Sequence, residues 1–205
     1  SKNHVKNWRA MSSNSVFFTD KPNKEILRDI FNRIEQTGEP GFVNSRAADK
    51  RRPNFNGINP CAEILLDNKG VCNLTEVNLY SFVYDRGDGT YNLRTDLLRN
   101  SIRRAVRVGL RQTNVTLELP EWDKIQKRDR LTGVSLTGVE DAFDKLALSE
   151  AEERNLLNIL EDSANIAAES YAKQMRIPAP LLVTTVKPSG TISQLPTVSS
   201  GVHRS

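Results

Sequence analysis

A stretch of five residues near position 60 places three side chains that could act together in catalysis. Asn59, Cys61 and Glu63 alternate along Asn59-Pro60-Cys61-Ala62-Glu63. In an extended segment alternate residues project to the same side, so an amide, a thiol and a carboxylate would face one way. A neighbouring carboxylate disfavours the thiolate, which argues against polar attack by the cysteine. One-electron chemistry at sulfur, with the carboxylate accepting a hydroxyl proton from a substrate, is compatible with the arrangement.

Two plainer interpretations of the cysteines stay open. Cys61 is also consistent with a small buried residue near a turn. The second cysteine, Cys72, follows eleven residues later, and two cysteines in 205 residues do not make a disulfide framework. A zinc site is disfavoured, because the two histidines, His4 and His203, lie at opposite ends of the chain. No metal ligand is therefore predicted.

A second candidate site lies near the end of the chain. The β-branched run 181–186 predicts a buried strand that leads into Lys187-Pro188-Ser189-Gly190-Thr191, followed by a short helix from about Ile192. Unpaired amides at a helix start bind anions, glycine permits close approach, and the Ser189, Thr191 and Ser193 hydroxyls and Lys187 would add donors. An ordinary strand-to-helix turn is the alternative. The Walker pattern is absent, so an ATPase is not indicated.

These stretches resemble a known family. Asn59-Pro60-Cys61-Ala62-Glu63-Ile64, Gly70-Val71-Cys72-Asn73-Leu74 and Lys187-Pro188-Ser189-Gly190-Thr191-Ile192-Ser193 are together similar to the large catalytic subunit of ribonucleotide reductases, above all the class II, adenosylcobalamin-dependent branch. Supporting matches are 11–16, 38–42 and 132–138, so the resemblance runs nearly end to end. Class II reductases are several times longer, which implies that this chain is an internal piece of a larger catalytic barrel.

The resemblance implies a role for each candidate residue. Cys61 would become a thiyl radical that abstracts the 3′ hydrogen of the ribonucleotide, Glu63 would take the 3′-hydroxyl proton, and Asn59 would hold the substrate hydroxyls. Cys72 would be one of two reducing thiols, and its partner is expected upstream, outside the chain. The loop that would hold the substrate phosphates comprises Pro188, Ser189, Gly190, Thr191, Ile192 and Ser193.

The expected activity is reduction of ribonucleotides to 2′-deoxyribonucleotides for DNA synthesis. The resemblance implies adenosylcobalamin as cofactor, a ribonucleoside di- or triphosphate as substrate, a thioredoxin-type reductant and the remainder of the parent chain. The 205 residues alone are expected to be inactive. The alternative within the family is a class I large subunit, which receives its radical from a small subunit. Nothing in the sequence identifies the radical generator independently.

The fold expected is α/β. The resemblance implies part of a ten-stranded α/β barrel with the reactive cysteine on a central loop, and residues 1–205 would belong to the second half-barrel of a single catalytic domain. The patterns predict strands at 15–19, within 71–82, at 131–136 and at 181–186. Helices are predicted from Thr19 or Asp20 to Gly38, from Thr95 or Asp96 to about Gln112, after Pro120, from Thr137 to about Leu146 and from Ser149 to about Met175. Residues 44–59 are predicted to form a basic loop.

Charge and hydropathy set further limits. The net charge is +4, and Arg99, Arg103, Arg107 and Arg111 recur every four residues, which forms a basic stripe on a helix. A non-catalytic nucleotide- or nucleic-acid-binding module could use such a stripe. A solvated face is the other interpretation, because no aromatic residues interleave the arginines to stack bases. No apolar run approaches a membrane span and no signal-peptide pattern opens the chain, so a cytoplasmic location is expected.

Overall fold

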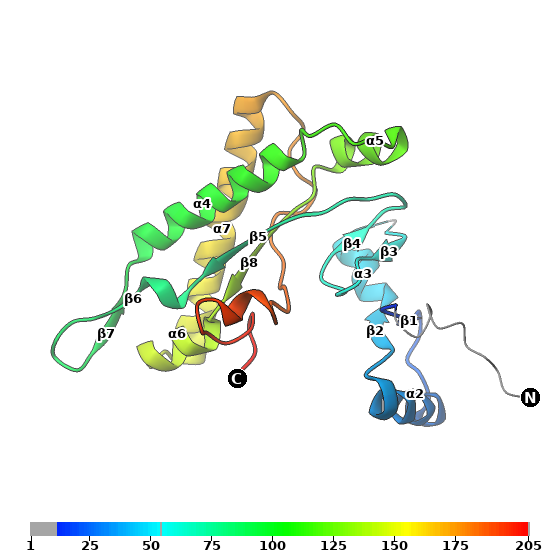
Figure 1. Cartoon of the computed structure of the whole chain (residues 1–205), viewed down its shortest axis with the longest axis horizontal. Coiled ribbons are helices and arrows are strands. Elements are labelled where there is room, and N and C mark those ends of the chain that lie inside the picture. Colours follow the sequence, from blue (N-terminus) through cyan, green and yellow to red (C-terminus); the bar gives the residue numbers. More distant parts are fainter. Residues whose placement is uncertain (1–11, 54, 205) are drawn as a thin grey trace, which may run out of the picture. The chain divides into compact units, whose positions relative to one another are not determined.

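The computed structural model describes residues 12–53 and 55–204 (Figure 1). His4 and the first residue of the stretch 11–16 lie outside these ranges. Contacts divide the chain into two compact units, Ser1–Asn68 (unit 1) and Lys69–Ser205 (unit 2), and each has its own buried apolar residues. Within the described ranges, no helix is both long enough and apolar enough to cross a membrane.

Unit 1 is built on one β-α-β arrangement. Strand β1 (Ser15–Phe18) pairs in parallel with β2 (Gly41–Asn44), and helix α2 (Lys24–Thr37) connects them. The rings of Phe31 and Phe42 lie 5.6 Å apart between their centres, so the helix covers the strands with aromatic contacts. The strand predicted at 15–19 and the end of the helix at Gly38 are confirmed, since Gly38 adopts the left-handed conformation that ends a helix.

Two predictions about the helices of unit 1 were wrong. Helix α2 is capped by Asn23, whose Oδ1 accepts the Ile26 N–H at 2.8 Å, and not by Thr19 or Asp20. The stretch predicted as a basic loop contains helix α3 (Ser45–Arg51), which begins at an Asn44 cap. Basic residues in the last turn of a helix are favourable to its dipole, so their abundance did not exclude a helix. Unit 1 ends in an antiparallel hairpin of β3 (Gly57–Ile58) and β4 (Leu65–Leu66).

The centre of unit 2 is a parallel pair of strands. β5 (Asn73–Asn78) and β8 (Thr132–Thr137) pair over six residues. Segment 182–185 lies along the other edge of β8, where the Val134 N–H donates to the Val183 carbonyl at 2.9 Å. Parallel strands joined by helices confirm the α/β prediction. In the described residues the strands form two-stranded sheets and no closed barrel, and the strand predicted at 181–186 is reduced to a bridge at Thr184.

Most remaining elements of unit 2 match the sequence patterns. The longest helix begins at Ser149, as predicted, with a capping box: the Glu152 carboxylate accepts the Ser149 N–H at 2.8 Å. The Ser149 hydroxyl and amide hold the pKa of Glu152 below its ordinary value. The elements are 3₁₀ helix η1 (Tyr80–Phe82), hairpin strands β6 (Val83–Asp85) and β7 (Tyr91–Leu93), helices α4 (Thr95–Gln112), α5 (Pro120–Asp129), α6 (Val139–Leu146) and α7 (Glu150–Met175), and 3₁₀ helix η2 (Ile192–Gln194).

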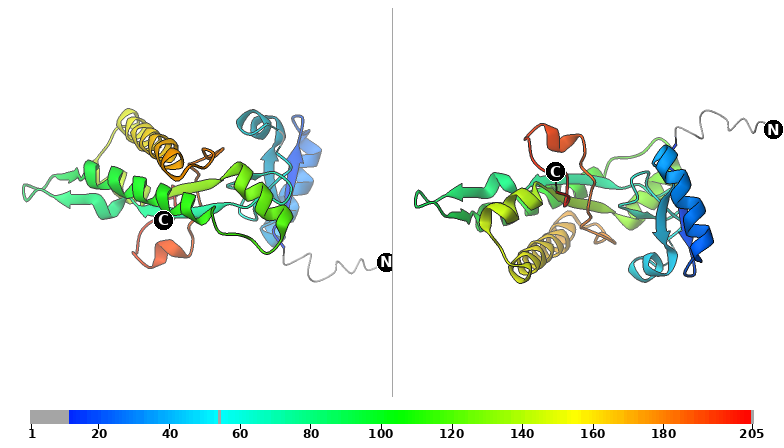
Figure 2. Two further views of the ribbon diagram at one scale, coloured as in Figure 1. Left: turned by 90° about the horizontal axis from the view of Figure 1, so that it is seen from above. Right: turned by 90° about the horizontal axis from the view of Figure 1, so that it is seen from below.

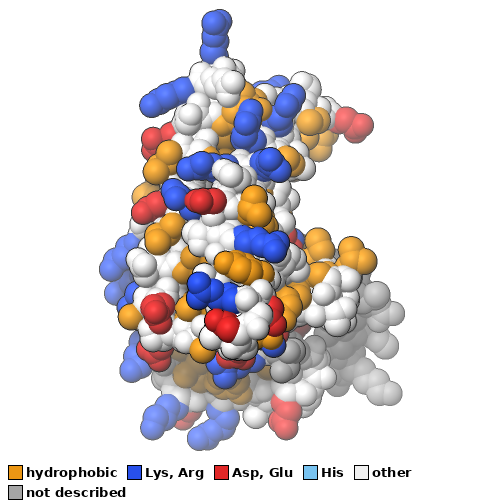
Figure 3. Space-filling view, turned by 90° about the vertical axis from the view of Figure 1, so that its left-hand side faces the viewer, with side chains coloured by type: hydrophobic (Ala, Val, Ile, Leu, Met, Phe, Trp, Pro, Cys, Tyr) orange, Lys and Arg blue, Asp and Glu red, His pale blue; other side chains and the backbone are white. Residues whose placement is uncertain are grey.

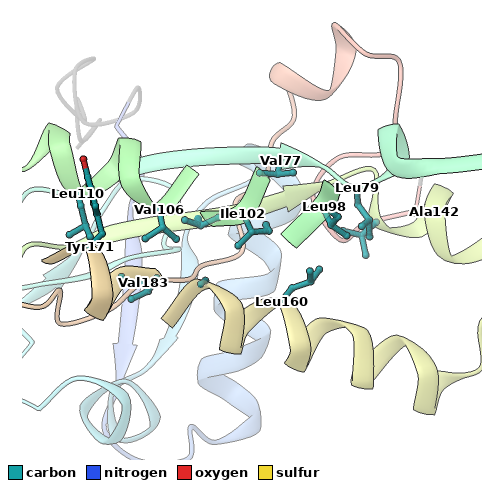
Figure 4. Close-up of a cluster of buried hydrophobic side chains, with 14 of the residues drawn as sticks. Val77, Leu79, Leu98, Ile102, Val106, Leu110, Ala142, Leu160, Tyr171 and Val183 are labelled. Atoms are coloured by element: carbon teal, nitrogen blue, oxygen red, sulfur yellow. The ribbon is translucent and has the colours of Figure 1, made fainter. Parts of the chain in front are cut away.

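The core of unit 2 lies where α4 meets α7 and the parallel strands (Figure 4). Apolar side chains spaced three or four residues apart on α4 point into this core, whereas the side chain of Leu97 is 55% exposed. Gly109 allows α4 to approach β8 closely, because a Cβ there would lie 3.2 Å from Thr132 Cγ2. The labelled core residues are Val77, Leu79, Leu98, Ile102, Val106, Leu110, Ala142, Leu160, Tyr171 and Val183.

The arginine stripe of α4 serves packing at two of its four positions. Arg99 Nε donates to Ser163 Oγ at 3.1 Å, and the Arg107 guanidinium lies 4.5 Å from the centre of the Tyr171 ring. Both partners are on α7. On the face shown in Figure 3, basic side chains are interspersed with acidic and hydrophobic ones. The stripe is therefore partly a contact between helices, which weakens the case for a nucleic-acid-binding surface.

Truncation of Leu98 tests this account of the core. Leu98 is fully buried on α4, so Leu98→Ala should lower the free energy of unfolding by about 2–5 kcal/mol through lost burial and a cavity. Leu97→Ala, at the neighbouring exposed position, should change it by less than about 0.5 kcal/mol. Urea denaturation followed by circular dichroism measures both. Equal effects of the two variants would contradict the packing described.

Candidate active site

The cysteine stretch forms the turn between β3 and β4. The Ala62 N–H donates to the Asn59 carbonyl at 2.9 Å, with Pro60 and Cys61 in the middle of the turn. The prediction of an extended segment was therefore wrong, and strict alternation does not align the three side chains. The backbone reverses at this point, and this places the Cys61 thiol in an exposed position while Glu63 is half-buried.

The Asn59 side chain stabilises this turn. Its Oδ1 accepts the N–H of Ile64 at 2.9 Å, and its own backbone N–H donates to the Ile64 carbonyl at 3.2 Å. Ile64 is buried, so the hydrogen bonds fix the loop to the interior of unit 1. The amide oxygen thus has a structural partner within the turn.

Arg52 holds the same hairpin and was missed by the sequence analysis. Its side chain is almost fully buried, and Nη1 donates to the Leu65 carbonyl at 2.6 Å, next to Glu63. A charge-assisted hydrogen bond of this kind is strong in a buried setting. Within the basic run Arg51-Arg52, nothing in the sequence distinguished the buried arginine from the exposed one, because the distinction depends on where the hairpin folds back.

The remaining candidate residues belong to unit 2. Cys72 is half-buried and lies directly before β5. The predicted phosphate-binding stretch follows segment 182–185, and the loop 187–201 lies on the opposite side of the β5–β8 pair from α7 (Figure 2). The short helix expected from Ile192 is confirmed as η2. Unit 1 therefore contains Asn59, Cys61 and Glu63 in one turn, and unit 2 contains Cys72 and the loop.

Three groups expected to donate to phosphate have partners within unit 2 itself. Lys187 Nζ lies 2.7 Å from Glu76 Oε2, and the Ser189 hydroxyl donates to the other oxygen of Glu76. Ser193 is fully buried with its Oγ 3.2 Å from Ser200 Oγ. Gly190, Thr191 and Ile192 are exposed. The donors left for an anion are the amides of these three residues and the Thr191 hydroxyl.

Glu76 is a second residue that the sequence analysis missed. It lies in β5, opposite Ser135 of β8, and its side chain is only 5% exposed. Burial of a carboxylate requires a charged or hydrogen-bonding partner. A glutamate between Thr75 and Val77 within a predicted strand is the signal that could have identified it, but its partner lies 111 residues away in the sequence.

The far end of loop 187–201 closes back onto its beginning. Thr137 Oγ1 donates to the Ser199 carbonyl at 3.0 Å, and Asp141 accepts the Ser199 N–H at 2.6 Å. Gly201 has a φ of 52°, and a Cβ there would lie 2.4 Å from the Lys187 carbonyl oxygen. Only glycine fits this close approach. The loop is therefore anchored at both ends, with residues 190–192 exposed between the anchors.

Comparison with known proteins identifies a family for most of the chain. Residues 2–169 match the family described as "Ribonucleotide reductase, barrel domain". A putative adenosylcobalamin-dependent ribonucleoside-triphosphate reductase of Mycobacterium phage D29 is 34% identical over 185 residues, covering 87% of this chain and 26% of the relative. The adenosylcobalamin-dependent ribonucleoside-triphosphate reductase of Lactobacillus acidophilus is 30% identical, covering 95% and 29%. The chain thus spans less than a third of these relatives.

Two solved structures share the fold. A B-12 dependent class II ribonucleotide reductase aligns with a TM-score of 0.73 at 24% identity, covering 93% of this chain and 30% of that one. The class Id ribonucleotide reductase alpha subunit of Actinobacillus ureae aligns with a TM-score of 0.65 at 18% identity, covering 88% and 39%. At these identities the likeness concerns the fold.

Substitution of Asn59 tests how the cysteine turn is held. Asn59→Ala removes the acceptor of the Ile64 N–H, and the amide of Ile64 should exchange with deuterium about tenfold faster. Asn59→Asp keeps an acceptor oxygen and should retain most of the protection. Hydrogen exchange read by NMR measures both variants. Equal protection of Ile64 in Asn59→Ala and the wild type would show that the side chain does not brace the turn.

Proposed function

Because the chain belongs to the ribonucleotide reductase barrel-domain family, we propose that it forms part of a catalytic barrel that reduces ribonucleotides to 2′-deoxyribonucleotides. The parallel β-α-β arrangements of both units would contribute strands to the second half of a ten-stranded barrel within a single catalytic domain. The share of the relatives that the chain spans supports an incomplete barrel. The rest of the barrel would come from further parts of a parent protein.

The observation that carries the proposal is the Cys61 thiol at the exposed tip of a hydrogen-bonded turn. A thiol that must exchange a hydrogen atom with both a radical source and a substrate has to be accessible and fixed in place. The bonds between Asn59, Ala62 and Ile64 provide the fixation. As a thiyl radical, Cys61 takes the 3′ hydrogen of the ribose, and it returns a hydrogen at the end of the reaction.

Glu63 and Asn59 act on the substrate hydroxyls in this proposal. Glu63 accepts the 3′-hydroxyl proton, which assists loss of the 2′-hydroxyl as water. The NH₂ group of Asn59 donates a hydrogen bond to a substrate hydroxyl while its oxygen stays bonded to Ile64. Cys72 supplies one of the two thiols that deliver two electrons and two protons, and the pair ends as a disulfide. A thioredoxin-type protein then reduces that disulfide.

Adenosylcobalamin is the proposed cofactor and a ribonucleoside triphosphate the proposed substrate, and the names of the relatives support both. When bound, this cofactor supplies the radical that oxidises the cysteine. The exposed Cys61 thiol fits a radical source that approaches from outside the chain. The same names favour class II over the class I alternative. The cytoplasmic location expected from the sequence stays a prediction.

The substrate phosphates would bind the loop Pro188–Ser193 mainly through its backbone amides, and not through the hydroxyls of Ser189 and Ser193. Gly190, Thr191 and Ile192 are exposed residues, and their backbone amides, with the Thr191 hydroxyl, would meet the phosphate oxygens. The hydroxyls of Ser189 and Ser193 shape the loop from inside. A separate nucleic-acid-binding role for the arginine stripe has little support, since Arg99 and Arg107 contact α7.

Substitution of Cys61 in the full-length reductase tests this function. Cys61→Ser should reduce turnover below detection, because a hydroxyl does not form the required radical, while the affinity for a ribonucleoside triphosphate should change by less than about threefold. Deoxynucleotide formation with a dithiol reductant, with and without adenosylcobalamin, measures activity. Wild-type turnover should require the cofactor.

Cys61→Ala serves as a second inactive variant, and substitution at the exposed Asn92 of the β6–β7 hairpin serves as a control that should keep full turnover. Product formation that depends on an added metal-loaded small subunit and not on cobalamin would assign the enzyme to class I. Turnover that survives Cys61→Ser would overturn the proposed role of the thiol.

A further inference from the structure

We propose that Glu76 is a positioning residue for the phosphate-binding loop, and that Lys187 acts through Glu76 and does not itself bind phosphate. This inference rests on the proposed function of loop 187–201. It assigns a task to a carboxylate in β5 that belongs to neither the cysteine turn nor the loop. In this arrangement the backbone amides of the exposed residues 190–192 are the groups positioned to bind the substrate phosphates.

The Glu76 side chain makes polar contacts with Lys187 and Ser189 of the loop, and these contacts are nearly buried. The Glu76 side chain is 5% exposed and that of Lys187 is 20% exposed, with 2.7 Å between Oε2 and Nζ. The Ser189 hydroxyl donates to Oε1. Both carboxylate oxygens are thus engaged by side chains that lie two residues apart. A single carboxylate clamps the start of the loop onto β5.

Electrostatics explains why Lys187 is not available as a ligand. A buried carboxylate without a charged partner is strongly unfavourable, so Lys187 is needed where it lies. For Lys187 to reach a phosphate, the ion pair would have to break and leave Glu76 uncompensated. As long as the pair is closed, its net charge is zero, and the attraction for an anion comes from the backbone amides.

The clamp also determines the backbone course of the loop. Ser189 has a φ of 55°, an unfavourable conformation for a residue other than glycine. Its hydroxyl bond to Glu76 stabilises that conformation, and its carbonyl accepts the Ser193 N–H at 3.1 Å, which begins η2. The Lys187 N–H donates to Ser135 Oγ at 2.9 Å, and Ser135 is the register partner of Glu76. Two adjacent strands thus hold residues 187 and 189.

Glu76→Gln separates this proposal from direct phosphate binding by Lys187. Glutamine keeps the size of the side chain but removes the charge. If Lys187 were a phosphate ligand, releasing it from Glu76 would strengthen triphosphate binding. If Glu76 positions the loop, the same substitution weakens binding. In the full-length reductase we expect KM for the ribonucleoside triphosphate to rise about tenfold, with kcat changed less than about threefold.

Matched variants complete the test. Glu121→Gln removes the carboxylate of the exposed pair that Glu121 forms with Lys69 and should leave KM unchanged. Lys187→Arg can keep the ion pair and should stay within about threefold of the wild-type KM, whereas Lys187→Met should resemble or exceed Glu76→Gln. A KM that falls or stays constant in Glu76→Gln would overturn the proposal.

Two measurements on the 205-residue chain do not depend on turnover. In Glu76→Gln, the amides of Lys187 and Ser193 should exchange with deuterium about tenfold faster, while that of Ile64 in unit 1 stays unchanged. Inorganic triphosphate should shift the NMR signals of the Gly190–Ile192 amides in the wild type, and the shift should weaken in Glu76→Gln. Unchanged exchange, or no triphosphate shift in the wild type, would refute the positioning role. Failure of the reductase assay alone would count against the proposed function only.

Discussion

The alternation of side chains along the parallel β5–β8 pair is the constraint on which unit 2 depends. Successive residues of a strand face opposite sides, so Val77 and Val134 pack against the helices while Glu76 and Ser135 face the other way. The apolar side buries α4 and α7, which contribute most of the core. The polar side receives loop 187–201. One register therefore positions both the core and the candidate phosphate site.

Unit 1 carries the candidate reactive thiol, Cys61, at an exposed position on a short hairpin. Two residues in each strand provide few ladder bonds, so the turn depends on additional contacts. Asn59 provides them from within the loop, and Arg52 provides one from the preceding helix end. In the proposed mechanism Asn59 also meets the substrate. In that proposal one side chain has a structural role through its oxygen and a chemical role through its NH₂ group.

The loop of unit 2 shows how a charged residue in a binding motif can serve the protein itself. Lys187 stands beside Ser189 and Gly190 in a stretch that suggests direct contact with phosphate, yet its ammonium is paired with a buried carboxylate. The backbone amides of residues 190–192 are then the groups proposed to bind the anion. Their geometry depends on the residues that anchor the loop, from Glu76 at one end to Thr137 and Gly201 at the other.

Local patterns in the sequence were sufficient to predict the α/β class, the helices α4 and α7, and the family resemblance. They were also sufficient to identify the two stretches that contain the candidate site residues. Each rests on residues within a few positions of one another. The burial of Arg52 and the pairing of Glu76 with Lys187 were decided by tertiary structure. The physical reason is that burial and ion pairing depend on which distant segments meet, and 111 residues separate Glu76 from its partner. Composition identifies a charge, but only the fold determines whether that charge faces solvent, a ligand or another side chain.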